Sequence, residues 1–145
     1  MATILIVDDR PSNRSYLAAL LSYTEHRTLE AADGAHALAI TRDERPDLII
    51  TDILMPTMDG YEFVQQLRAD PVLRGTRVIF FSAVYSEHET MAMAARCGVT
   101  TVLGKPAEPQ RILEAVAAEL GVARGAPAPS LPLAPERDRD LPFDL

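Results

Sequence analysis

The stretch ILIVDD at residues 4–9 runs from four apolar residues directly into two carboxylates. Three later stretches follow the same design: LIITD at residues 48–52, VIFFS at 78–82 and TVLGK at 101–105. Short apolar runs that alternate with helical patterns are typical of buried parallel strands. In an open α/β sheet, ligands bind just beyond the carboxyl ends of the strands. We therefore expect three carboxylates, a hydroxyl and an amine to meet in one crevice suited to a divalent cation and a phosphoryl group.

Residues 1–121 contain five strand patterns in strict alternation with five helix patterns, which predicts an α/β fold with a parallel sheet. The strands are expected near residues 3–7, 28–31, 47–51, 77–81 and 100–103. The helices are expected at 12–23, from about 35 to a point before Pro46, and at 61–68, 87–96 and 109–120. The fourth helix is weakly apolar, and its candidates for the inward face are Met91, Ala94 and Ala95.

The remaining residues, 122–145, have a different composition. Residues 124–145 hold five of the chain's eleven prolines and a charged stretch, RDRD at 137–140. Such a composition indicates an extended linker or a docking arm rather than a sixth helix. We therefore divide the chain into a domain at 1–121 and a proline-rich linker or docking arm at 122–145.

The bulk composition narrows the functional class. A length of 145 residues with 48% hydrophobic and 24% charged side chains is typical of one soluble globular domain. The net charge of −7 argues against nucleic acid as a partner, because phosphate binding needs a basic face. The single cysteine, Cys97, excludes an internal disulfide. No apolar stretch approaches the roughly 20 residues of a membrane span and no signal peptide is apparent, so we expect no membrane contact and a cytoplasmic location.

The carboxylates at the strand ends allow two interpretations. Asp8 and Asp9 are adjacent and would repel each other in a crevice without a cation, and Mg²⁺ prefers oxygen ligands. Beside such a cation, Asp52 could attack phosphorus and become an aspartyl phosphate. Each of the three could instead lie in a solvated turn or cap a helix.

Two further side chains suit a phosphoryl group. Lys105 can neutralise one phosphoryl oxygen as a compact charge, and the Ser82 hydroxyl can hydrogen-bond another. Either residue is common on surfaces and indicates little alone. The Lys105–Pro106 bond is a candidate for the cis form, and the alternative is an ordinary trans loop proline.

Together these motifs resemble the receiver domain of two-component response regulators over about residues 2–121. The resemblance rests on the acidic pair at 8–9, EAADG at 30–34, the loop DILMPTMDG at 52–60, Ser82-Ala83 and Lys105-Pro106. It implies a three-layer, doubly wound (βα)5 flavodoxin-like fold with a parallel five-stranded sheet of order 2-1-3-4-5.

The resemblance also implies a role for each site residue. Asp52 would be the phosphoacceptor and would take its phosphoryl group from a histidine kinase or a phosphotransfer protein. Mg²⁺, with Mn²⁺ as a substitute, would be bound by Asp9, Asp52 and the backbone carbonyl of Leu54. Asp8 would bind the metal through a water. The phosphoryl-binding and switch residues would be Ser82, Ala83 and Lys105.

Three positions depart from the family's pattern. Val102 occupies the place of the usual switch aromatic and has no ring to bury or expose; Tyr85 is a candidate substitute, and the alternative is a surface loop tyrosine. Leu54 and Val84 flank the expected path of the hydrolytic water, and apolar side chains cannot orient a water by hydrogen bonding. We therefore expect slow self-dephosphorylation.

The sequence leaves three functions open. The first is a signalling switch, not an enzyme acting on external substrates, in which phosphorylation changes a protein–protein surface. The second is a receiver-like scaffold that works without phosphorylation. The third is a magnesium-dependent phosphohydrolase of the haloacid dehalogenase type, which Leu54 disfavours because that class has a second Asp at this position. The chain fits either a stand-alone receiver or the N-terminal receiver of a hybrid sensor histidine kinase. Its expected partners include a downstream protein target that the sequence does not identify, and a homodimer is a further candidate assembly.

Overall fold

The computed structural model describes residues 1–83 and 87–123 of the chain. Its strands are β1 (Thr3–Val7), β2 (Arg27–Ala31), β3 (Leu48–Thr51), β4 (Arg77–Ser82) and β5 (Thr101–Gly104). Its helices are α1 (Pro11–Leu21), α2 (Gly34–Glu44), α3 (Gly60–Ala69), α4 (Glu87–Arg96) and α5 (Pro109–Ala123). The strands form one parallel sheet in the order β2-β1-β3-β4-β5, which confirms the predicted fold class.

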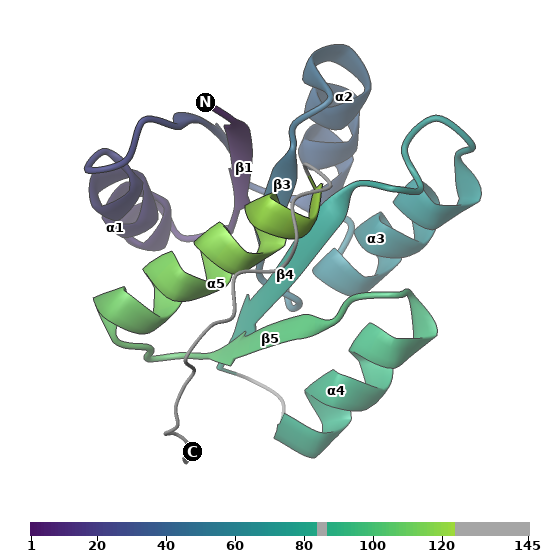
Figure 1. Cartoon of the computed structure of the whole chain (residues 1–145). Helices are drawn as coiled ribbons and strands as arrows, with labels where there is room; N and C mark the ends of the chain where they lie inside the picture. The colour runs from purple at the N-terminus through teal and green to yellow at the C-terminus, as the bar shows by residue number, and fades with distance from the viewer. Residues whose placement is uncertain (84–86, 124–145) are drawn as a thin grey trace.

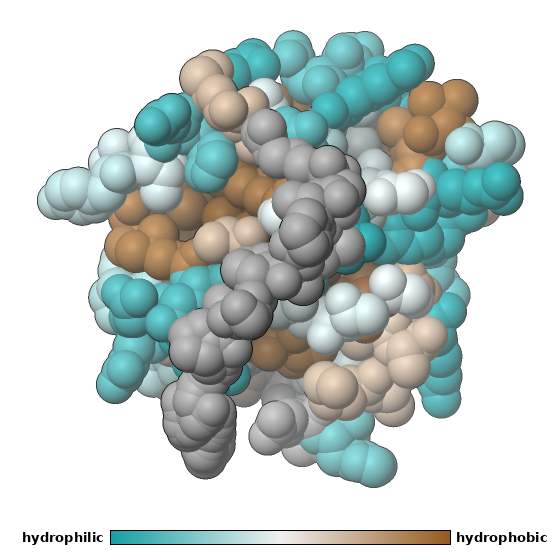
Figure 2. All heavy atoms as spheres, in the orientation of Figure 1, coloured by the Kyte–Doolittle hydropathy of each residue, from teal (hydrophilic) through white to brown (hydrophobic). Residues whose placement is uncertain are grey.

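Helices cover both faces of the sheet, with α1 and α5 on one side and α2, α3 and α4 on the other (Figure 1). Successive strand residues point to opposite faces. Ile4 and Ile6 therefore pack in the core beneath α1 and α5, whereas Leu5 and Val7 pack beneath the other three helices. Two covered faces explain why the inner strands β1, β3 and β4 are largely continuous apolar runs. In the space-filling view, apolar side chains are visible in the region of α1 and α5 (Figure 2).

The predicted boundaries agree closely with the strands and less closely with the helices. Each strand lies within one residue of its predicted limits. The helix α2 ends as expected before Pro46, because Arg45 takes a left-handed conformation with φ 47°. The helix α5 continues to Ala123, past the limit of 121 proposed for the domain. The rest of the proposed linker, 124–145, lies outside the described residues. Among residues 1–83 and 87–123, the helices are too short or too polar to span a membrane.

The inward face of α4 confirms the prediction at Ala94 and differs from it at Met91 and Ala95. Met91 is 48% exposed and Ala95 is also exposed, whereas Thr90, Ala94 and Cys97 are buried. The buried positions are spaced at i, i+4 and i+7, so they share one helical face that carries little apolar surface. The apolarity of Met91 suggested the wrong side of the helix. Burial also raises the pKa of the Cys97 thiol above its usual range.

Two polar anchors lie toward the amino edge of the sheet. Arg68 of α3 donates from Nε to the Cys97 carbonyl and from Nη1 to the carbonyls of Arg74 and Thr76, each over 2.8 Å. These bonds join the end of α3 to the end of α4 and to the chain that enters β4. These carbonyls lie beyond the ends of the helices and have no helical hydrogen-bond donor, so the Arg68 side chain supplies one.

The second anchor is Glu119 of α5, which is 6% exposed. Its carboxylate accepts hydrogen bonds from the hydroxyls of Thr101, at the start of β5, and Thr100. The Arg77 Nε lies 3.2 Å from Glu119 Oε1, although the angle there does not make a hydrogen bond. One buried carboxylate is thus matched by one guanidinium and two hydroxyls, and α5 is fixed to β4 and β5.

Candidate functional site

The strand register brings the predicted site residues together at the carboxyl edge of the sheet. Val7 pairs with Thr51, so Asp8 and Asp52 follow the ends of two neighbouring strands. The ladder continues past the strand ends, because the Asp52 amide donates to the Val7 carbonyl over 2.9 Å and the Lys105 amide donates to the Ser82 carbonyl over 3.1 Å. Four strands therefore deliver their terminal side chains to one crevice, as the sequence predicts.

Three carboxylates form the centre of this crevice. Asp8, Asp9 and Asp52 each offer one oxygen, and these oxygens all lie within 4.8 Å of one another. Asp8 is 2% exposed and Asp52 is 9% exposed, whereas Asp9 is exposed. Carboxylates held this close in a poorly hydrated site repel strongly. The donor set therefore fits a hard divalent cation, which prefers carboxylate oxygen and keeps several waters.

Lys105 is the single lysine among the 145 residues, and it lies against these carboxylates. Its Nζ is 2.7 Å from Asp8 Oδ2 and 3.1 Å from Asp52 Oδ2. The same Nζ lies 5.3 Å from the ring centroid of Phe81, within range of a cation–π contact. One ammonium thus bridges two of three carboxylates and leaves the cluster with excess negative charge.

The loop after β3 folds tightly around Asp52. Its Oδ1 accepts a hydrogen bond from the Ile53 amide over 2.7 Å. The Gly60 amide donates to the Ile53 carbonyl over 2.7 Å, and a Cβ at Gly60 would lie 1.9 Å from the Asp52 carbonyl oxygen. A glycine is required there because any side chain would collide with backbone. Thr57, within the loop, has φ 69°, a conformation that a β-branched residue rarely adopts.

The remaining predicted residues surround this centre. The Ser82 side chain is 5% exposed at the end of β4, Ala83 is exposed, and the Lys105–Pro106 peptide bond is cis. Leu54 is 51% exposed. Val102, the atypical switch position, is half-buried and packs against the core beneath α2, α3 and α4. Val84 and Tyr85 lie outside the described residues, so the hypotheses about them stay predictions.

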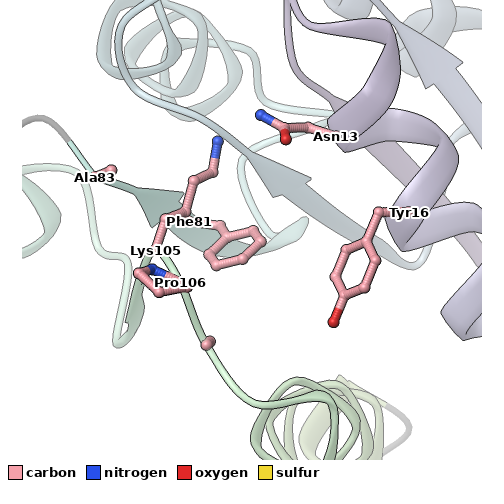
Figure 3. Close-up of a pocket in the computed structure, with 7 residues that line it drawn as sticks. Asn13, Tyr16, Phe81, Ala83, Lys105 and Pro106 are labelled. Carbon is pink, nitrogen blue, oxygen red and sulfur yellow. The ribbon is translucent and has the colours of Figure 1, made fainter.

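A pocket of about 340 Å³ opens beside the crevice, between α1 and the end of β5. Asn13 and Tyr16 of α1 face Phe81 and Lys105 across it, and Lys105 lines both the pocket and the acidic cluster (Figure 3). Asn13 was not predicted as a site residue. A signal was present in the sequence, because Pro11 fixes the start of α1 and places Asn13 in the first turn after the acidic pair.

Comparisons with known proteins agree with this geometry. The family model for the response regulator receiver domain matches residues 4–117, and the chain therefore belongs to that family. Protein PilH of Pseudomonas aeruginosa is 33% identical over 120 residues, which cover 83% of this chain and 98% of the relative. The sporulation initiation phosphotransferase F of Bacillus subtilis is 34% identical over 113 residues, covering 78% and 89% of the two chains.

Solved structures show the same relationship. The signal receiver domain of a histidine kinase from Syntrophus aciditrophicus superimposes with a TM-score of 0.79 at 30% identity, covering 91% of this chain and 99% of that one. The chemotaxis protein CheY4 of Vibrio cholerae superimposes with a TM-score of 0.75 at 33% identity, covering 81% and 97%. The chain is thus a two-component receiver domain of phosphorelay signalling. Membership of this family favours a signalling domain over an enzyme that turns over external substrates.

Proposed function

We propose that Asp52 accepts a phosphoryl group from a histidine kinase or a phosphotransfer protein and that the change is passed on through a protein–protein surface. The observation that carries this proposal is the acidic cluster itself. Three carboxylates lie within 4.8 Å of one another, and the chain's single lysine bridges two of them. Such an arrangement opposes folding through charge repulsion, so it favours a role in binding and group transfer.

The donor set supports a Mg²⁺ site made from Asp9, Asp52 and the backbone carbonyl of Leu54, with Asp8 acting through a water. Mn²⁺ offers a similar preference for oxygen ligands and is expected to substitute. Bound there, the cation would supply neutralisation of the charge on the transferring phosphoryl group. Asp9 is exposed and open to a ligand, whereas both oxygens of Asp8 already accept hydrogen bonds within the protein.

The chemical step is a nucleophilic displacement at phosphorus. A carboxylate oxygen of Asp52 forms the new O–P bond, the P–N bond of the phosphohistidine breaks, and the donor imidazole leaves with the electron pair. We expect Lys105, which contacts Asp52 over 3.1 Å, to pair with a phosphoryl oxygen. We expect the Ser82 hydroxyl, in a residue buried at the end of β4, to bond another phosphoryl oxygen, with Ala83 next to it in the chain.

The proposal is tested by intact-mass measurement after incubation with acetyl phosphate, with and without Mg²⁺. We expect the wild type to gain the mass of one phosphoryl group only with Mg²⁺ present and Asp52→Asn to gain none. Asp33→Asn is the matched control, because Asp33 caps α2 at a strand end and lies outside the cluster. Labelling of Asp52→Asn to the wild-type extent would overturn the assignment of the phosphoacceptor.

A scaffold that works without phosphorylation is the second candidate, and Val102 is the observation that favours it. Val102 occupies the position where the family usually has its switch aromatic. It pairs with Phe80 across β4 and β5, and its side chain packs against the core. A wild type that gains no phosphoryl group from acetyl phosphate or from a charged phosphotransfer protein would favour this candidate. We infer that a phosphorylated chain needs another side chain to take the role of the switch aromatic, and Tyr85 is the candidate. An unchanged conformational response to phosphorylation in Tyr85→Ala would contradict that role.

The lifetime of the phosphorylated state depends on Leu54. Its side chain is 51% exposed beside Asp52 and can neither donate nor accept a hydrogen bond to a hydrolytic water. We predict that Leu54→Asn speeds loss of the phosphoryl group severalfold, measured by intact mass over time after removal of the donor. Leu54→Met is the apolar control. Equal lifetimes for Leu54→Asn and the wild type would contradict this explanation of slow decay.

A further inference from the structure

Asp8 has donors on both of its carboxylate oxygens. Its Oδ1 accepts from the Arg10 amide over 2.9 Å, and its Oδ2 accepts from Lys105 over 2.7 Å. The Asn13 carboxamide spans the pair, with Nδ2 3.4 Å from Oδ1 and 3.3 Å from Oδ2. Three donors from three places in the chain therefore fix the orientation of a carboxylate that is 2% exposed.

The other two carboxylates are held less tightly. Asp52 accepts from the Ile53 amide on Oδ1 and from Lys105 on Oδ2, the latter over the longer distance of 3.1 Å. Asp9 is exposed, and within residues 1–83 and 87–123 its side chain makes no hydrogen bond. Asp8 thus has the least acceptor capacity left for a metal, and Asp9 has the most.

We propose that Asn13 is a positioning residue of the acidic site. Its carboxamide holds Asp8 as the anchor of Lys105, which draws the ammonium toward Asp8 and leaves Asp9 and Asp52 to receive the cation. This inference rests on the proposed function, because it assigns different duties to carboxylates of one metal site. Partners that orient a ligand set typically change metal affinity about 10–100-fold when they are removed.

The start of α1 is built to deliver this contact. Pro11 opens the helix, and the Arg14 Nη1 donates to the backbone carbonyl of Asp8 over 2.8 Å. The Arg14 Nε in turn lies 3.2 Å from Glu30 at the end of β2. The first turn of α1 is therefore tied to two strand ends, and Figure 3 shows Asn13 extending from it toward Lys105. The backbone that carries Asn13 is therefore fixed relative to Asp8.

The first test measures Mg²⁺ affinity by calorimetry on the intact chain. We expect Asn13→Leu, which keeps the volume and removes the donor, to raise the dissociation constant about tenfold. Asn13→Gln keeps a donor on a longer side chain, and its dissociation constant is expected to lie between those of the wild type and Asn13→Leu. Ser15→Ala, an exposed change on the same helix, is the control and should match the wild type. Equal affinities for the wild type and Asn13→Leu would overturn the positioning role.

The second test needs no metal and uses the fact that Lys105 is the single lysine. With a chelator present, the rate of amine labelling at Lys105 is followed by peptide mass, which separates it from the amino terminus. Asn13→Leu should label faster, because an Asp8 carboxylate that lacks the Asn13 donor is less fixed in orientation and holds the ammonium less firmly. An unchanged rate would overturn the anchoring role. A wild type that binds no Mg²⁺ would instead overturn the proposed function, so the two failures are distinguishable.

Discussion

Buried carboxylates lie at both edges of this sheet, and their surroundings differ. At the amino edge, Glu119 is paired with Arg77 and with two threonine hydroxyls. At the carboxyl edge, Asp8 and Asp52 share one lysine, and Asp9 adds a third negative charge within 4.8 Å. The first arrangement satisfies its charge and fixes α5 to the sheet. The second keeps an excess of negative charge that fits the proposed cation site, and we therefore call it the functional edge.

The largest change in the free energy of unfolding is expected from removing the Glu119 carboxylate, whose charge is matched by Arg77. Glu119→Ala would leave Arg77 without its charge partner and two threonine hydroxyls without an acceptor. Because Arg77 is 33% exposed and can regain water, we predict a loss of about 3 kcal/mol in the free energy of unfolding, at the low end for a buried pair. Urea unfolding measures this, with the exposed Glu114→Ala on the same helix as control. A loss below that of Glu114→Ala would contradict the anchoring role.

A somewhat smaller loss is expected at the other anchor of the amino edge. Arg68→Met keeps the aliphatic stem and removes the donors to three backbone carbonyls. At about 1 kcal/mol for each net hydrogen bond, with part of each regained through water, we predict a loss of about 2 kcal/mol. Phosphorylation by acetyl phosphate should keep its wild-type extent under conditions where the variant is folded. If Arg68→Met blocked phosphorylation without loss of stability, the separation of the two edges would be wrong.

A gain is expected within the loop of the functional edge. Thr57 has φ 69°, which costs a β-branched residue of order 1–3 kcal/mol. Asparagine tolerates this conformation well, so Thr57→Asn should raise the free energy of unfolding by about 1 kcal/mol. Thr76→Asn, outside this conformation, is the control for the change of side chain. A destabilised Thr57→Asn would show that the threonine side chain contributes more than its backbone strain costs.

The sequence predicted the strands and the carboxyl edge well because both depend on local pattern. Four of the five strands lead into a residue of the predicted site, and parallel strands must align those ends. The inward face of α4 was predicted less well, since Thr90 and Cys97 carry little apolar signal. The anchors at Glu119 and Arg68 escaped prediction because their partners are distant in sequence; Thr101, for example, is 18 residues from Glu119. Contacts of that kind follow from tertiary packing and leave no periodic signal.

The most direct test of the charge excess is the unfolding free energy of Asp9→Asn, measured in urea with a chelator and again with excess Mg²⁺. In the chelator we predict that Asp9→Asn is more stable than the wild type by about 1 kcal/mol, because one repelling charge is lost and no ion pair is broken. At Mg²⁺ a hundredfold above the dissociation constant, the wild type should gain about 2.7 kcal/mol and the variant far less. If Asp9→Asn were no more stable in the chelator and gained as much from Mg²⁺ as the wild type, the carboxyl edge would hold no charge excess awaiting a cation.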